Sequence, residues 1–457
     1  MRLMTRLALL ALAACALFLP ASAAATSTSA QIRASVGKSV GYLKSQQESD
    51  GGFGTSWVLG ALAAAGTPAA AVTPRGGSSN ARAYERNLLG DTATWPGESE
   101  PPVTDFEQAT LNSYAAGIDP ARVSKTQNLI AQIASYYQPA NPGYYGSPSV
   151  FSGTVFGLLA LAQTKTTKGV ERVPRPLLER SIAVLRANQH NDGGWGYEKA
   201  EGSPSELAEP GEPDETGAAI AALCSAGVAN SDPAIVAAKD YLKSDIVASS
   251  GAFETPFGPN TDSDAWAVEG LNACHIAAQG SEFTTTDGKT PIDFLISQQL
   301  PEGGFVYEAG ESAAEEYSSQ DAVRALAGGG FTAVPPKPKG APQWLAEANF
   351  ESGVSSPLAL IIDNSTATLA VCSVAVTPAG STTTLAAVLH AAESSATPSG
   401  CVTSFAPSSG SKAITQIDGS PTPASAAWHI RIDGGAEKTA KRSSRIKLGD
   451  TIYLRES

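Results

Sequence analysis

The sequence NQHNDGGWG at residues 188–196 has two near copies elsewhere in the chain. QQESDGGFG occupies residues 46–54, and QQLPEGGF occupies residues 298–305. Each copy contains a glutamine, an acidic residue, two glycines and an aromatic residue in the same order. Two adjacent glycines allow a turn that a side chain would obstruct, so the repeat predicts one structural turn used three times. We interpret the glutamine and the aromatic residue as holding a helix end against this Gly-Gly turn, and we assign no catalysis to its acidic residues.

A second repeat, an apolar helical segment, occurs six times between residues 30 and 331. Each copy has a Thr, Asp or Ser followed seven residues later by a Leu, as in TGAAIAAL from Thr216 to Leu223. Side-chain oxygens of these residue types accept backbone N–H groups where a helix starts, so each is expected to be an N-cap. The expected caps are Thr55, Thr104, Thr154, Thr216, Asp264 and Ser319.

More polar helical patterns alternate with the apolar segments, as in PRPLLERSIAVLRANQ at residues 174–189. Charges between apolar residues at helical spacing are typical of a half-exposed helix. The apolar segments are nearly uncharged, so they are expected to be buried on both sides. A polar outer helix, a turn and an apolar inner helix, repeated six times, predict a closed ring of helix pairs rather than an open solenoid.

The composition excludes several classes of function. The 457 residues are 42% hydrophobic and 16% charged, which provides for a large core, and the net charge is -13. No basic run occurs in the sequence, which argues against binding to nucleic acid or to an anionic membrane surface. The four histidines are scattered without the spacing of metal ligands, so no metal site is predicted.

Residues 1–25 have the pattern of a secretory signal peptide. Two arginines precede an apolar stretch at residues 7–19, and Ala-Ser-Ala at residues 21–23 offers a cleavage site. LAAC at residues 12–15 also fits a lipobox, which would instead attach a lipid to Cys15. No other apolar run reaches the length of a membrane span, so a secreted mature chain without an integral span is expected.

The stretch QHNDGGWG, followed by DETGAAIAAL, resembles the repeat of the prenyltransferase and squalene-cyclase superfamily. The resemblance covers about residues 30–330 and depends on the three Gly-Gly turns. It implies an α/α toroid with a central cavity. The expected fold is therefore mainly α, an α/α toroid of six helix pairs with a small C-terminal β-rich (α+β) domain.

The C-terminal region has strand patterns of its own. AAWHIRIDGG at residues 426–435 alternates and ends in a turn, and TIYLRE at residues 451–456 predicts a short strand. Trp428, the Asp433-Gly434 turn and Gly449-Asp450 are similar to the C-terminal domain of transcobalamin-type proteins. A toroid followed by such a domain resembles the layout of cobalamin carriers, and that resemblance implies a corrinoid as the ligand.

These patterns divide the chain into a signal peptide, a toroid, a Pro-rich linker and a transcobalamin-like domain. Their expected bounds are residues 1–25, 30–331, 332–345 and 346–457. An even number of cysteines after an export signal indicates disulfides, although the sequence alone allows three pairings. The division into domains favours the pairs Cys224–Cys274 and Cys372–Cys401.

One acidic cluster could carry chemistry. Squalene-type cyclases protonate an alkene with the middle Asp of a D-x-D-D motif, and the matching stretch here is EPDE, with Asp214 between Glu212 and Glu215. Clustered carboxylates can retain a proton, which makes Asp214 a candidate acid. Acidic residues also favour helix N-termini through the helix dipole alone. A single toroid, an export signal and only 7% aromatic residues favour this second interpretation.

A candidate ligand site follows from the inner helices. Aromatic residues stand two positions after four of the six expected caps, and mostly small residues stand six positions after each on the same face. This pattern predicts a lined opening, and plain core packing between inner helices explains it equally well. The short linker should let the C-terminal domain reach the same rim. The candidate ligand-binding residues are Trp57, Phe106, Phe156, Asp262, Trp266 and Trp428.

The resulting expectation is a secreted, non-catalytic protein that holds a small-molecule ligand between its toroid and its C-terminal domain. The ligand would be a corrinoid, as the resemblance implies, or another small apolar molecule. One alternative is a terpene-cyclase-like enzyme that uses Asp214. Another alternative is a structural surface protein in which the toroid is only a scaffold.

Overall fold

The computed structural model describes residues 26–456, apart from the short stretches 167–168, 338, 340–343, 365–368, 408–411, 419 and 422–426. The expected signal peptide and Cys15 lie outside the described residues, as does part of the expected linker. Among the described residues, no helix has both the length and the apolar character needed to cross a membrane.

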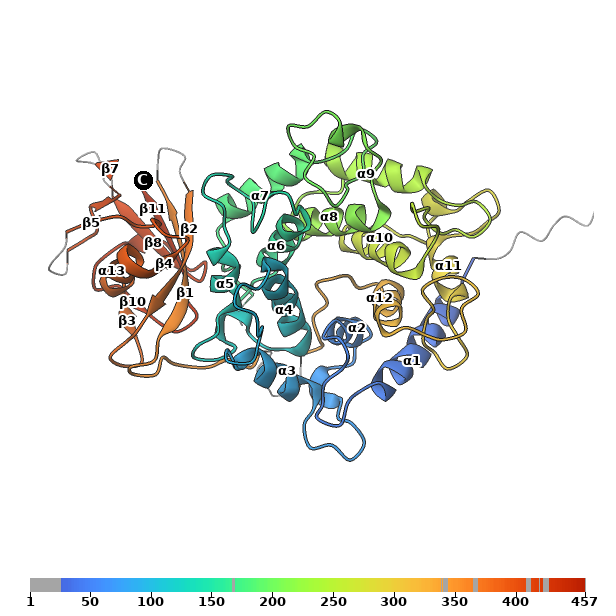
Figure 1. Cartoon of the computed structure of the whole chain (residues 1–457), viewed down its shortest axis with the longest axis horizontal. Helices are drawn as coiled ribbons and strands as arrows, with labels where there is room; N and C mark the ends of the chain where they lie inside the picture. The colour runs from blue at the N-terminus through green and yellow to red at the C-terminus, as the bar shows by residue number, and fades with distance from the viewer. Residues whose placement is uncertain are drawn as a thin grey trace, which may run out of the picture.

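Twelve of the described helices form a closed ring of six pairs (Figure 1). The inner helices contact each other in the order α2, α4, α6, α8, α10 and α12, and α12 returns to contact α2. The inner helices are α2 (Val58–Ala64), α4 (Val103–Ala116), α6 (Ser152–Ala162), α8 (Pro213–Ser225), α10 (Thr261–Ala273) and α12 (Glu316–Leu326). The outer helices are α1 (Ser29–Ser45), α3 (Ala81–Gly90), α5 (Leu129–Ser135), α7 (Arg175–Ala187), α9 (Pro233–Ser244) and α11 (Pro291–Ser297). The predicted α/α toroid of six pairs is confirmed.

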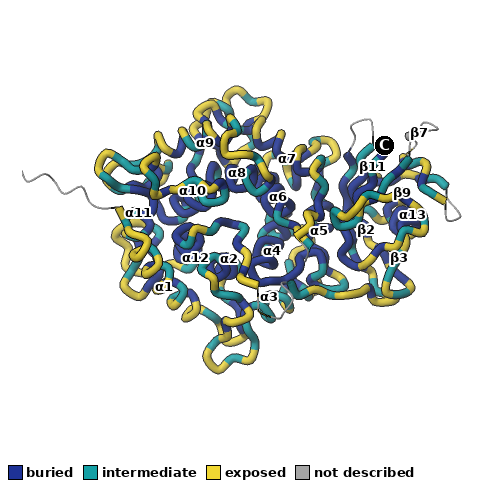
Figure 2. The backbone as a smooth tube through the Cα atoms, turned by 180° about the vertical axis from the view of Figure 1, so that it is seen from behind, coloured by how far each residue is buried: buried dark blue, intermediate teal, exposed yellow. Residues whose placement is uncertain are grey.

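The inner helices are mostly buried (Figure 2), and most of their buried residues are small or apolar. Every residue of α6 is buried, from Ser152 to Ala162. Gly217 and Gly270 let α8 and α10 approach closely, since a Cβ atom at either position would collide with backbone of the other helix. The predicted disulfide between Cys224 and Cys274 joins the C-terminal ends of these two helices.

Each of the three Gly-Gly turns packs against a neighbouring part of the ring. Gly193 has a φ of 100°, and a Cβ atom there would lie 2.5 Å from the carbonyl oxygen of Ala237 in α9. The Gln189 amide donates to the carbonyls of Gly193 and Ala234, both at 2.8 Å. Gln47 and Gln299 donate in the same way to the carbonyl oxygens of Gly51 and Gly303, the first glycine of their own turns, at 2.9 and 3.1 Å. The structural interpretation of the turn is therefore confirmed.

The expected N-caps are wrong as helix starts. Thr55 precedes α2, and the other five residues lie within the first turn of their helices, because residues such as Pro213 begin the helix earlier. Four of these side chains instead accept the backbone N–H of an aromatic residue in the preceding segment. The accepting pairs are Thr154 with Tyr145 at 3.3 Å, Thr216 with Trp195 at 3.0 Å, Asp264 with Phe253 at 3.2 Å, and Ser319 with Phe305 at 2.8 Å.

The C-terminal domain is built on a six-stranded sheet in the order β4-β2-β1-β11-β8-β9, in which β1 and β11 are parallel and the other neighbours antiparallel. Its strands are β1 (Ser356–Asp363), β2 (Leu369–Val376), β4 (Ala396–Thr397), β8 (Trp428–Ile432), β9 (Lys438–Thr439) and β11 (Thr451–Glu456). Short strands β3 (Thr383–Thr384) and β10 (Arg445–Ile446) pair with each other, and β5 (Phe405–Ala406), β6 (Gln416–Ile417) and β7 (Ser420–Pro421) form a third sheet. The predicted Cys372–Cys401 disulfide is present.

Both faces of the large sheet are covered, which decides where the domain sits. Helix α13 (Leu385–Ser395) packs on one face, and α5 of the toroid packs on β1 and β2 from the other (Figure 1). Along β1, Leu358 and Leu360 belong to the core of the C-terminal domain, whereas Ala359 and Ile361 belong to the core of the toroid. A strand buried on both sides accounts for the nearly continuous apolar run of β1.

The expectation that the C-terminal domain covers a rim of the ring is therefore wrong. The domain docks on an outer helix, because the apolar second face of its sheet needs an apolar partner and α5 supplies one. The chain before β1 also lies along the toroid. Leu345 exchanges backbone hydrogen bonds with Gly117 and Asp119 at 2.9 and 2.8 Å, and the Trp344 ring lies 5.0 Å from the ring of Tyr114.

Candidate functional site

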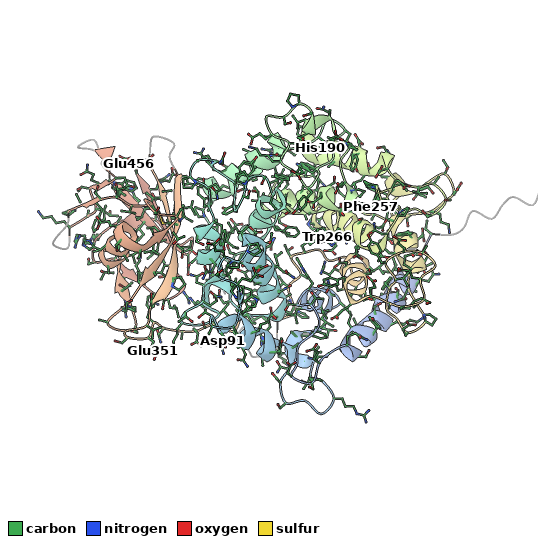
Figure 3. The ribbon with its side chains drawn as sticks, in the orientation of Figure 1. Asp91, His190, Phe257, Trp266, Glu351 and Glu456 are labelled. Carbon is green, nitrogen blue, oxygen red and sulfur yellow. A yellow bond between two sulfur atoms is a disulfide. The ribbon has the colours of Figure 1, made fainter. Side chains whose placement is uncertain are left out.

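Three of the predicted site residues meet at the centre of the ring. The rings of Trp57 and Trp266 lie 6.3 and 5.6 Å from the ring of Phe156. Figure 3 shows Trp266 in the middle of the toroid. A fourth aromatic residue, Phe331, lies 5.1 Å from Trp266 and 5.7 Å from Phe156 and is only 2% exposed. We call Trp57, Phe156, Trp266 and Phe331 the ring-centre cluster.

Phe331 is a residue that the sequence analysis missed. It follows three consecutive glycines after α12, which let the chain turn back between neighbouring helices. A Cβ atom at Gly329 would lie 2.6 Å from the side chain of Ala64, and one at Gly330 would lie 3.1 Å from the carbonyl oxygen of Glu269. The GGGF sequence at residues 328–331 is the signal that could have indicated this path. The protein's own chain thus fills the centre of the ring.

A buried ion-pair network lies beside the ring-centre cluster. The Arg324 guanidinium donates to Glu269 at 3.0 Å and to Asp321 at 2.6 Å, and the Trp266 indole N–H donates to Asp321 at 2.9 Å. The guanidinium carbon also lies 4.9 Å from the centre of the Trp57 ring, within the range of a cation–π contact. Burial alone would lower the pKa of Arg324, but the carboxylates of Glu269 and Asp321 outweigh it and raise that pKa.

The acidic candidates lie at the N-terminal ends of α8 and α10. Asp214 accepts a hydrogen bond from Ser263 at 3.0 Å. Burial, and then Asp214 and Glu212, raise the pKa of Glu215 to about 8. One buried oxygen of Glu215 and one of Asp262 have no hydrogen-bond partner among the described residues. Within the EPDE stretch, the carboxyl group whose pKa is raised to about 8 is therefore Glu215, the neighbour of the residue singled out from the sequence.

Asp262, on α10, lies at the same mouth of the ring and is close to Asp321 of α12. Burial, followed by the charge of Asp321, raises the pKa of Asp262 to about 7.

The remaining two candidates, Phe106 and Trp428, lie away from the ring-centre cluster. Phe106 packs against Trp95 at 5.6 Å and Tyr136 at 5.9 Å, and Trp428 is fully buried in the core of the C-terminal domain.

Beside the apolar contact between α5 and the sheet, the seam between the two domains also holds polar groups. Arg172 and Asp119 form two hydrogen bonds of 2.8 and 2.7 Å, and both side chains are 2% exposed. Arg122 donates to Asp450 at 3.2 Å across the seam. A Cβ atom at Gly434 would collide with the backbone of Glu171, so only glycine allows the two domains to approach this closely.

A cleft of about 450 Å³ opens at the edge of this seam. We call it the seam cleft. Its toroid wall is residues 169–176, and its other wall includes Arg431, Gly434, Tyr453 and Arg455. Arg431 and Arg455 both pair with the single carboxylate of Glu437, at 3.2 and 3.1 Å. Two guanidinium groups thus share one counter-charge, which leaves a local positive charge on a protein of net charge -13.

Among the described residues, no group of three or more His, Cys, Asp or Glu side chains is arranged to hold a metal ion. The structure presents a filled aromatic ring centre, a carboxyl group of raised pKa at one mouth of the ring, and a basic cleft between the domains.

No protein-family model matches the sequence, and no curated protein matches it. Among solved structures, a type II terpene cyclase from Scytonema is 16% identical, with 66% of this chain and 98% of that chain covered and a TM-score of 0.44. Haptocorrin in complex with Cbi is 11% identical, with 94% of this chain and 97% of that chain covered and a TM-score of 0.35.

A protein geranylgeranyltransferase-I from Candida albicans in complex with GGPP is 14% identical, with 50% of this chain and 66% of that chain covered and a TM-score of 0.36. The families that the sequence resembles are thus present among the structural neighbours. At these TM-scores the likenesses carry no argument about function, and the toroid assignment rests on the closed ring of helix pairs.

Proposed function

We propose that the chain is an exported, non-catalytic binding protein whose small-molecule ligand occupies the seam cleft. The observation that carries this proposal is the cleft of about 450 Å³ with one wall from each domain. Pockets of roughly 300–1,000 Å³ between domains are common ligand sites. The ring centre is a poorer candidate for the ligand site, because Phe331 already packs among its aromatic residues. The two disulfides favour an oxidising compartment and so support export.

The walls of the seam cleft favour a ligand with an anionic edge. Arg431 and Arg455 share the carboxylate of Glu437, so a carboxylate or phosphate group on the ligand would complete their hydrogen bonding. Val170 and Pro176 on the opposite wall offer apolar contact. A corrinoid is the ligand that the transcobalamin resemblance implies. Only part of so large a molecule would enter a cleft of this volume.

Equilibrium dialysis with cobalamin and with cobinamide tests this proposal. The proteins to compare are the wild type, the double variant Arg431→Met with Arg455→Met, and Arg75→Met, which removes one arginine charge from an exposed loop of the toroid. We expect binding by the wild type and by Arg75→Met, and binding weaker by about tenfold or more in the double variant, because charge-assisted hydrogen bonds are lost.

Two results would count against the proposal in different ways. If neither corrinoid binds the wild type, the ligand is wrong, and native mass spectrometry of protein purified from its own source should identify what it carries. If a corrinoid binds all three proteins equally, the ligand is supported but its position in the seam cleft is wrong.

A second candidate function is the terpene-cyclase-like enzyme. The observation that favours it is the protonated carboxyl of Glu215 beside Asp214, since such a pair could deliver a proton to an alkene. The ring centre would then have to release Phe331 to admit a substrate. Turnover of squalene or a polyprenyl substrate by the wild type, lost in Asp214→Asn, would replace the binding proposal with this one.

A further inference from the structure

We propose that a second pocket, at the mouth of the ring, binds a small organic ammonium ion. This mouth pocket has a volume of about 240 Å³ and lies among α2, α3, α4 and the start of α12. The side chains that carry the argument are Glu85, Trp95, Asp105, Gln108, Asn112 and Tyr317. It shares no lining residue with the seam cleft, so this proposal is independent of the function proposed above.

Glu85 is the central observation. The residue is 1% exposed, yet it lines the mouth pocket from the outer helix α3. One of its carboxylate oxygens accepts from the Ser56 hydroxyl at 2.9 Å, while the other oxygen is buried and has no hydrogen-bond partner among the described residues. A buried acceptor without a donor is unfavourable, so a ligand that donates a hydrogen bond here is stabilised.

The neighbouring amides have unused hydrogen-bonding capacity as well. Asn112 is 2% exposed and lines the mouth pocket from α4, and its amide makes no hydrogen bond to any described residue. Gln108, one turn earlier on α4, lines the same pocket. Amide oxygens can accept from a ligand that donates several hydrogen bonds, as an ammonium group does.

The charge of the pocket walls favours a cation. Glu85 and Asp105 contribute carboxyl groups, and none of the residues that line the mouth pocket is Lys, Arg or His. Burial raises the pKa of Glu85 to about 7, and burial followed by the charge of Glu98 raises the pKa of Asp105. A bound cation would lower both pKa values, because it would stabilise the ionised carboxylates of Glu85 and Asp105.

The surroundings favour an organic cation over a metal ion. No set of three or more metal-binding side chains is assembled anywhere in the described stretches of the chain, and the pocket includes the aromatic rings of Trp95 and Tyr317. Aromatic faces attract ammonium groups through cation–π contact. The volume of 240 Å³ is below that of pockets for drug-sized ligands, so the ligand should be small.

Isothermal titration calorimetry with n-butylammonium chloride tests the proposal, and n-butanol serves as a neutral probe of the same shape. The proteins are the mature wild type, Glu85→Gln and the control Glu198→Gln, which makes the same change at an exposed residue elsewhere on the toroid. We expect equal butylammonium affinity in the wild type and in Glu198→Gln, about tenfold weaker affinity in Glu85→Gln, and weaker binding of n-butanol than of butylammonium.

The proposal is overturned if butylammonium does not bind the wild type, if Glu85→Gln binds it unchanged, or if n-butanol binds as tightly. Thermal melting should show whether Glu85→Gln folds. If it does not, Asp105→Asn replaces it, since Asp105 is partly exposed and tolerates substitution more readily. The same loss of butylammonium affinity is then expected in Asp105→Asn, and unchanged affinity again overturns the proposal.

Discussion

The centre of the ring and the seam between the domains both hold buried arginines, but they use them differently. In the centre, Arg324 pairs with two carboxylates and lies over the Trp57 ring, so every direction around it is occupied. At the seam, Arg172 is buried with Asp119, while Arg431 and Arg455 lie at the edge with one shared carboxylate between them.

This difference explains where a ligand has room. A ring of six helix pairs encloses a concave space, but three glycines and Phe331 bring the chain back into that space. The two domains meet along one face of the sheet, and a cleft of about 450 Å³ remains between them at the edge of this contact. The centre of the ring is thus filled, and the boundary between the domains supplies the proposed binding surface.

Replacing Arg324 should have the largest effect on stability. Arg324→Met leaves Glu269 and Asp321 buried without their cation, which should lower the free energy of unfolding by about 3–5 kcal/mol. Urea unfolding followed by tryptophan fluorescence measures this loss. Arg431→Met at the seam is the matched control and should lose less than about 1 kcal/mol, since its side chain is 46% exposed. Equal losses would remove the distinction between the two regions.

Shortening Phe331 should have a somewhat smaller effect. Phe331→Ala removes the aromatic group that contacts Trp57, Phe156 and Trp266, and a loss of about 3 kcal/mol is expected for a buried phenylalanine. Phe257→Ala is the control, because that side chain is 86% exposed and should change stability by less than about 0.5 kcal/mol. A similar result for both variants would mean that the ring centre is not a packed core.

The pH dependence of stability should have opposite signs in the two regions. The pKa of Glu215 in the ring is raised from 4.5 to about 8, so the folded chain keeps a proton that the unfolded chain releases. Its contribution is complete below about pH 4.5 and is lost as the pH rises toward 8, by up to about 1.4 kcal/mol per pH unit. Glu215→Gln should therefore flatten the stability profile between pH 5 and 8.

Glu437 at the seam provides the contrast. Burial alone would raise its pKa, but Arg455 and Arg431 outweigh that effect and lower it. Its contribution is present above the ordinary pKa and is lost as the pH falls, so Glu437→Gln should alter the profile only on the acid side. Urea unfolding of both variants from pH 4 to pH 8 checks the two signs, and identical profiles would contradict the assignment of a proton to Glu215.

Much of the fold was predictable from the sequence because its signals are local. The Gly-Gly turns need a backbone that only glycine adopts easily, and Gln189 and its two equivalents each donate a hydrogen bond to the first glycine of their own turn. The apolar and polar helices alternate with a clear period, and each disulfide joins cysteines of one domain. The predicted helix starts were wrong because they assumed a donor in the first turn of the helix. The actual donor to the Thr216 side chain is the backbone N–H of Trp195, which lies 21 residues away.

The positions of the candidate sites depended on the tertiary structure. Periodicity indicates which face of an element is buried, but it does not identify the element that covers that face. For this reason the sequence by itself determined a toroid, a β-rich domain, two disulfides and a set of aromatic residues on the inner helices. Only the tertiary structure decided that α5 covers the second face of the sheet, that Phe331 fills the ring centre, and that Glu85 and Asn112 meet at one pocket, because each of these contacts joins segments far apart in the chain.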